Sequence, residues 1–77
     1  MTDTVLDARR LLCPLPVIRT QNAAQQLHDG QTLRVICSDP GVIHDIPAWC
    51  RVHGHEVLDI REAEDEIIIR IRIHDTD

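Results

Sequence analysis

EIIIRIRI, residues 66–73, is the stretch that most constrains the fold of this 77-residue chain. Isoleucine recurs at positions 67, 69, 71 and 73, while arginine stands at 70 and 72. This alternation predicts a β-strand with one apolar face and one face that can meet water. The isoleucine face must be covered by other parts of the chain, because exposed aliphatic surface is unfavourable in water.

The stretches on the N-terminal side of this strand supply its neighbours in a sheet. HEVLDI, 55–60, predicts a strand joined to 66–73 by an acidic turn, and the two should form an antiparallel hairpin. TLRVIC, 32–37, alternates, with Leu33, Val35 and Cys37 on one face and Thr32, Arg34 and Ile36 on the other. TVLDA, 4–8, is a short first strand.

Two helices are expected between these strands. After Pro14, apolar residues recur at helical spacing, and this first helix should end at Gly30, which can adopt a left-handed C-cap conformation. The second helix is predicted from Asp45, as its N-cap, to His53, with Gly54 closing it. SDPG, 38–41, is a turn signal.

The element order is therefore β-α-β-α-β-β in a single domain, residues 1–77. A strand, helix and strand in succession imply a parallel pair, so the sheet should be mixed and four-stranded. Two helices packed on one face complete an α/β two-layer sandwich. The other face, open to water, should carry the charged residues Arg34, Asp59, Arg61, Arg70 and Arg72.

Composition narrows the class of protein. The chain has 43% apolar residues, with Trp49 as its one aromatic residue, so the core must be aliphatic. A net charge of −5 with scattered arginines argues against direct nucleic-acid binding. No apolar run approaches a membrane span and no signal peptide opens the chain. Three cysteines, an odd number, fit a reducing compartment, and we expect a cytoplasmic protein.

LLCPLP, residues 11–16, is the candidate functional motif. We expect Cys13 at the N-cap of the first helix, with Pro14 as its first residue. A helix N-terminus carries partial positive charge, which predicts a lowered pKa for the Cys13 thiol and a nucleophilic thiolate. Pro14 and Pro16 have no N–H, so the amides near the sulfur should be those of Leu15 and Val17.

Three arginines flank this motif in the sequence and are candidates for charge or partner contacts: Arg9, Arg10 and Arg19. A structural interpretation stays open beside the functional one. The two prolines would then only start a helix, and Cys13 would be a small buried apolar residue. Pro16 lies in the first turn, so replacing it with alanine should leave the protein folded.

The remaining cysteines are interpreted first as packing residues. Cys37 lies on the apolar face of its strand, and Cys50 lies beside Trp49 in the second helix. Cys50, His53 and His55 suggest zinc, but their spacing matches no standard finger and a fourth ligand is missing, so no metal is predicted. Asp39 and Asp45 are interpreted as turn and cap residues rather than as an acid–base pair.

Two segments together resemble a known family: LDARRLLCPLPVIRT, 6–20, and GQTLRVICSDPGVIHDIPAWCRVHGHEV, 30–57. The chain is similar to the TusA/SirA-like family of small sulfur-carrier proteins over about residues 6–73. The resemblance rests on the Cys-Pro-x-Pro motif at Cys13–Pro16, the Asp-Pro turn at 39–40, DIP at 45–47 and GHEV at 54–57.

The resemblance implies a sulfurtransferase without a cofactor. Cys13 would take sulfane sulfur as a persulfide from a cysteine desulfurase or rhodanese-type donor and pass it to an acceptor protein. The chain departs from the family pattern at Arg10, where glycine is usual, and at Gln21 and Asn22, where lysine is frequent. The alternative is a non-catalytic regulatory or adaptor domain of the same fold.

Overall fold

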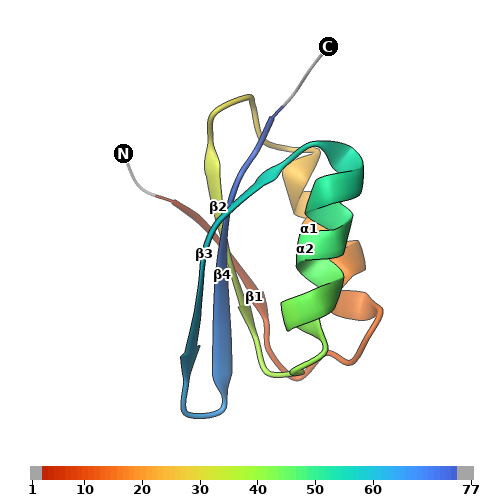
Figure 1. Cartoon of the computed structure of the whole chain (residues 1–77), viewed down its shortest axis with the longest axis vertical. Helices are drawn as coiled ribbons and strands as arrows, with labels where there is room; N and C mark the ends of the chain where they lie inside the picture. Colours follow the sequence, from red (N-terminus) through yellow and green to blue (C-terminus); the bar gives the residue numbers. More distant parts are fainter. Residues whose placement is uncertain (1–2, 75–77) are drawn as a thin grey trace.

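The computed structural model describes residues 3–74. Their order is β-α-β-α-β-β, as expected (Figure 1). The elements are β1 (Thr4–Ala8), α1 (Leu15–Ala24), β2 (Thr32–Cys37), α2 (Val42–His53), β3 (Glu56–Ala63) and β4 (Glu66–Arg72). Neither helix in the described part of the chain is long and apolar enough to cross a membrane.

The four strands form one mixed sheet in the order β1-β2-β4-β3. β1 and β2 are parallel, whereas β4 pairs antiparallel with both β2 and β3. The predicted hairpin is confirmed, with Ala63 opposite Glu66 across its turn. β3 runs to Ala63, three residues beyond the predicted end, because its pairing with β4 continues to that turn.

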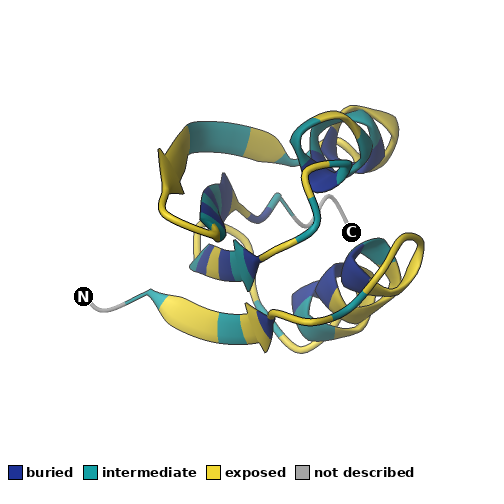
Figure 2. Ribbon diagram, turned by 90° about the horizontal axis from the view of Figure 1, so that it is seen from below, coloured by how far each residue is buried: buried dark blue, intermediate teal, exposed yellow. Residues whose placement is uncertain are grey.

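Both helices lie on the same face of the sheet and turn their buried sides toward it, so the two-layer sandwich is confirmed (Figure 2). The core between the layers is aliphatic, as the composition predicts. It contains the predicted strand positions Leu33, Val35, Cys37, Ile67, Ile69, Ile71 and Ile73, each with at most 7% of its surface exposed. The alternation in 32–37 and 66–73 therefore identified the core face of the two central strands.

The opposite face of the sheet has no helix over it and carries ion pairs. Arg70 contacts both Asp59, at 2.6 Å, and Asp3, at 3.2 Å, and Arg34 contacts the same Asp3 carboxylate at 3.2 Å. Such pairs on a solvated sheet face contribute little stability individually. They explain why arginine can alternate with isoleucine along β4.

The first helix is shorter than predicted. α1 ends at Ala24, not at Gly30. The amides of Gln26 and Leu27 bond three residues back, to Ala23 and Ala24, so the chain tightens after the last α-helical turn. Gly30 has a φ of 89° but lies in the turn before β2, where its N–H donates to the Ile73 carbonyl. The left-handed conformation predicted for Gly30 is confirmed, but the residue lies in the connection to β2 rather than at the end of α1.

The second helix starts earlier than predicted. α2 begins at Val42 with Gly41 as its N-cap, so the prediction of Asp45 as N-cap is wrong. The Asp39 carboxylate accepts the Gly41 N–H at 3.1 Å, which fixes the turn before the helix. Asp45 thus falls within the first turn of the helix. Gly54 closes α2 in a left-handed conformation, φ 79°, as predicted.

Candidate functional site

The site lies where β1 and β2 end. These strands are parallel, so their carboxyl ends meet at one edge of the sheet, and both connections to the helices start there (Figure 1). The first connection contains Cys13 and the second contains Asp39. The fold therefore brings together two segments that are about 26 residues apart in the chain. Crevices at this end of parallel strands are common ligand sites in α/β proteins.

Cys13 lies one residue farther from the helix than predicted. The N-cap of α1 is Pro14, and the Cys13–Pro14 peptide bond is cis. The Leu15 amide donates to the Leu12 carbonyl at 2.9 Å, and Pro16 has no N–H. These groups are therefore not available to the sulfur, contrary to the expectation for Leu15.

Two carboxylates contact Cys13. Its backbone N–H donates to Asp39 Oδ2 at 3.0 Å, and its Sγ donates to Asp45 Oδ2 at 2.9 Å. Asp39 also accepts the Gly41 N–H, so one carboxylate ties the β1–α1 connection to the start of α2. Asp45 extends from the first turn of α2. Within residues 3–74, neither carboxylate forms an ion pair.

These contacts reverse the predicted effect on the thiol. The hydrogen bond to Asp45, with partial desolvation and the charges of Asp45 and Asp39, raises the pKa of Cys13 above the ordinary 9.0. The prediction of a lowered pKa is wrong, because the charges that act on the thiol are negative and the Leu15 amide is bonded to the Leu12 carbonyl. At this site Cys13 is a thiol that donates a hydrogen bond to Asp45.

Cys13 is exposed, whereas Cys37 and Cys50 are buried. Burial raises the pKa of each of these two thiols to about 11. The interpretation of Cys37 and Cys50 as packing residues is confirmed. Because Cys13 is exposed, its interpretation as a buried apolar residue is wrong. Of the three thiols, Cys13 alone is accessible to a reactant.

The motif residues after Cys13 divide between core and surface. Pro16 is fully buried, and its carbonyl accepts the Thr20 hydroxyl at 2.8 Å. Val17 packs against the core. Three apolar side chains close to Cys13 in the sequence are instead exposed: Leu12, Leu15 and Ile18, at 72%, 45% and 45%.

The three candidate arginines behave differently from one another. Arg9 is held by Asp7 at 2.9 Å and Glu66 at 3.1 Å, and its guanidinium lowers the pKa of Asp7 to about 2. Arg10 and Arg19 are exposed and form no ion pair between residues 3 and 74. They present free positive charge, whereas Arg9 is already neutralised by its neighbours.

The backbone at Arg10 shows how this chain accommodates a departure from the family pattern, in which glycine is usual at this position. Its φ is 68°, in the left-handed region that glycine adopts without steric cost. Its backbone N–H donates to the Ser38 hydroxyl at 2.9 Å, which links the two connections at the site. The arginine therefore keeps the backbone conformation that the usual glycine favours.

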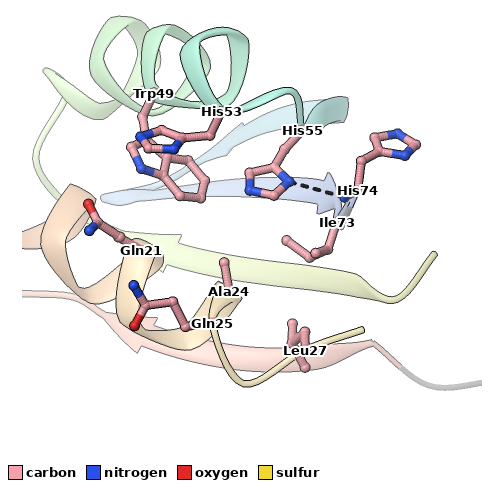
Figure 3. Close-up of a pocket in the computed structure, with 9 residues that line it drawn as sticks. All are labelled: Gln21, Ala24, Gln25, Leu27, Trp49, His53, His55, Ile73 and His74. Atoms are coloured by element: carbon pink, nitrogen blue, oxygen red, sulfur yellow. Dashed lines mark hydrogen bonds between the residues drawn. The ribbon is translucent and has the colours of Figure 1, made fainter. Parts of the chain in front are cut away.

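The residues that suggested zinc lie at the opposite end of the helices. His53 and His55 flank the Trp49 indole, with ring centroids 5.3 and 4.9 Å away, in a cavity of about 260 Å³ (Figure 3). His55 Nδ1 accepts the His74 backbone N–H at 3.1 Å. Cys50 is buried in the core and does not line the cavity. No three metal-ligating side chains converge anywhere in residues 3–74.

Sequence reasoning missed Asp39 and Asp45 as hydrogen-bond partners of Cys13, the first of its backbone N–H and the second of its thiol. Each was assigned a local role, and the turn role of Asp39 is real. One signal was available in the sequence. Parallel strands end at the same edge, so a polar residue just after β2 lies close to one just after β1.

The fold and the site define a small two-layer α/β domain that presents one accessible thiol beside two carboxylates. The chain belongs to the family described as sulfurtransferase TusA, whose model matches residues 4–73. It is 41% identical over 64 residues to a Bacillus subtilis protein named "Putative sulfur carrier protein YrkI", covering 83% of this chain and 85% of that protein. An Aquifex aeolicus protein named "Putative sulfur carrier protein" is 36% identical over 70 residues, covering 91% of this chain and 36% of the other.

A solved structure supports the same fold. The SirA-like protein from Desulfitobacterium hafniense superposes with a TM-score of 0.82 and covers 94% of this chain and 99% of its own. Its sequence identity of 22% makes this a likeness of fold alone. The family match over residues 4–73 and the relatives named above confirm the TusA/SirA-like resemblance.

Proposed function

We propose that this protein, as a single domain over residues 1–77, is a sulfur carrier that holds sulfane sulfur as a persulfide on Cys13. Family membership supports sulfur transfer as the general activity. The observation that carries the choice of residue is exposure, since Cys13 is the accessible thiol and Cys37 and Cys50 are buried. A carrier needs a thiol that a donor protein and an acceptor protein can both reach.

The proposed reaction exchanges one sulfur–sulfur bond for another. Cys13 Sγ forms a bond to the outer sulfur of a donor persulfide, the donor's own S–S bond breaks, and its electron pair leaves with the donor thiolate. An acceptor thiolate later attacks the outer sulfur on Cys13, and Cys13 is released as a thiol. The sulfane sulfur moves without net oxidation or reduction, so the cycle requires no cofactor.

The surface around Cys13 suits protein partners. Close to Cys13 in the sequence, Leu12, Leu15 and Ile18 expose apolar surface, and Arg10 and Arg19 are exposed. We infer a cysteine desulfurase or rhodanese-type protein as donor and a second protein as acceptor. The relay would serve tRNA wobble-uridine thiolation, molybdenum-cofactor sulfur supply or sulfur oxidation. Three free thiols suit the reducing cytoplasm.

Sulfur loading followed by mass spectrometry tests this proposal. After incubation with a cysteine desulfurase and cysteine, the protein should gain the mass of one sulfur atom on Cys13, and dithiothreitol should remove it. Cys13→Ser should gain none, because a hydroxyl does not attack sulfane sulfur as a thiolate does. Circular dichroism of this variant should match the wild type, since Cys13 is exposed.

The adaptor alternative makes the opposite prediction. A domain that acts only by binding a partner would load no sulfur, or would load all three thiols without preference. Equal loading of Cys13→Ser and wild type would exclude the carrier function and favour the adaptor. Peptide mapping after alkylation distinguishes Cys13 from Cys37 and Cys50 in the same samples.

A further inference from the structure

The contacts of Cys13 stabilise the protonated form of its thiol. Sγ donates its proton in a hydrogen bond to Asp45 Oδ2 at 2.9 Å, and the Cys13 N–H donates to Asp39. The charges that act on the sulfur are those of these two carboxylates. The neutral thiol is therefore favoured, and an anion on the same sulfur is disfavoured.

Binding of a sulfane sulfur to Cys13, if Cys13 carries sulfur as proposed above, changes which charge state the site favours. When Sγ bonds to the incoming sulfur, its own proton leaves and passes to the departing donor thiolate. The hydrogen bond from Sγ to Asp45 is then lost. A persulfide is a stronger acid than its parent thiol, so the loaded cysteine is anionic at neutral pH. Its charge lies beside the Asp45 carboxylate, and like charges at this range repel.

We propose that Asp45 sets how readily Cys13 gives up its sulfur, by stabilising the empty thiol and destabilising the loaded, anionic persulfide. Both effects favour transfer to the acceptor over retention. Asp45 contacts the reacting sulfur directly and lies in the first turn of α2. It makes Cys13 a carrier that releases sulfur instead of a site that accumulates it.

Asp45→Asn isolates the charge with almost no change in shape. The amide can donate an N–H to the persulfide anion, so repulsion is replaced by attraction, while the thiol loses an anionic acceptor. The variant should therefore hold sulfur more tightly, with a loading constant raised on the order of tenfold, the effect of one partly solvated charged hydrogen bond. The pKa of its Cys13 thiol should fall, which alkylation rates against pH would measure.

The experiment is an equilibrium titration. Wild type and Asp45→Asn are incubated without oxygen at neutral pH in mixtures of glutathione persulfide and glutathione of varied ratio. The loaded fraction is then read by intact mass after acid quenching. Half-loading of Asp45→Asn is expected at roughly a tenfold lower persulfide-to-thiol ratio than in wild type.

Two matched variants distinguish the effect of the charge at Asp45 from the effects of net charge and of substitution at this position. Asp45→Glu keeps the carboxylate and should load close to wild type. Glu56→Gln removes one negative charge at the start of β3, at the far end of the sheet from Cys13, and should also load like wild type (Figure 1). A shift shared by Glu56→Gln would mean that net charge, and not Asp45, sets the equilibrium.

The outcomes distinguish this inference from the proposed function. Equal half-loading of wild type and Asp45→Asn, with sulfur on Cys13 in both, would overturn the role of Asp45 and leave the carrier function intact. Tighter loading of wild type than of Asp45→Asn would overturn it as well. No loading of Cys13 in any variant would remove the carrier function and the inference with it.

Discussion

At the scale of single residues, Arg10 shows how the chain accommodates an arginine where the family pattern has glycine. Its left-handed backbone, φ 68°, is kept although a side chain with a Cβ makes this conformation unfavourable. In this conformation its N–H donates to the Ser38 hydroxyl, a hydrogen bond that joins the two connections at the site. The arginine adds an exposed positive charge to the β1–α1 connection at the expense of backbone strain.

Arg10→Gly should stabilise the fold relative to Arg10→Ala. Both variants lose the side-chain charge, but only glycine removes the Cβ that opposes a positive φ. The glycine variant should have the higher free energy of unfolding, by about 1 kcal/mol, measured by urea denaturation. If the alanine variant is equally stable or more stable, the left-handed conformation carries no strain in this chain.

At the scale of elements, the start of α1 combines a functional and a packing role. Cys13 and Pro14 are exposed before the helix, whereas Pro16, within its first turn, is fully buried. The expectation that Pro16 is merely a tolerated first-turn residue therefore requires revision. Its ring fills core space, and its carbonyl accepts the buried Thr20 hydroxyl.

Pro16→Ala should leave the protein folded but less stable, by about 1–3 kcal/mol. The change removes roughly two buried methylenes and frees the unfolded chain. Leu15→Ala is the matched control, because Leu15 is adjacent, 45% exposed, and should cost less than about 1 kcal/mol. Urea denaturation measures both. A loss for Pro16→Ala no greater than that for Leu15→Ala would contradict its role in packing.

At the scale of the whole molecule, the two ends of the helix layer have different chemistry. The end near the β1 and β2 termini holds the reactive thiol and two carboxylates. The other end holds Trp49 between two imidazoles, where His55 also joins the start of β3 to the residues after β4. Partial burial and the nearby His53 and His74 lower the pKa of His55 below its ordinary 6.5.

Stability should fall as the pH is lowered through about 6.5, the ordinary histidine value. The unfolded chain binds a proton to His55 near that pH, whereas the folded protein binds it only at lower pH, so protonation favours unfolding. A proton on Nδ1 would also remove the acceptor of the His74 N–H. Urea midpoints followed by Trp49 fluorescence at about pH 7.5 and about pH 5.5 measure the loss.

His55→Gln should lose less stability than wild type over the same pH interval, because the variant has no imidazole to protonate at that position. The comparison removes the contribution of the carboxylates, which both proteins share. An identical loss in wild type and His55→Gln would assign the pH dependence to other groups.

The sequence alone determined the features that depend on neighbouring residues. Alternation in 32–37 and 66–73 predicted two central strands and their core faces, and Gly54 predicted the end of α2. The element order and the family followed from these patterns and from the motif around Cys13. Periodicity and capping act within a few residues, so they can be identified without the fold.

Only the tertiary structure decided the chemical state of the site. Asp45 is 32 residues from Cys13 in the chain, and the two meet because parallel strands bring both connections to one edge of the sheet. Helix position by itself predicted a stabilised thiolate, whereas the assembled carboxylates favour the thiol. Electrostatic effects depend on distance in space rather than along the chain, and this distance is set only when the strands pair.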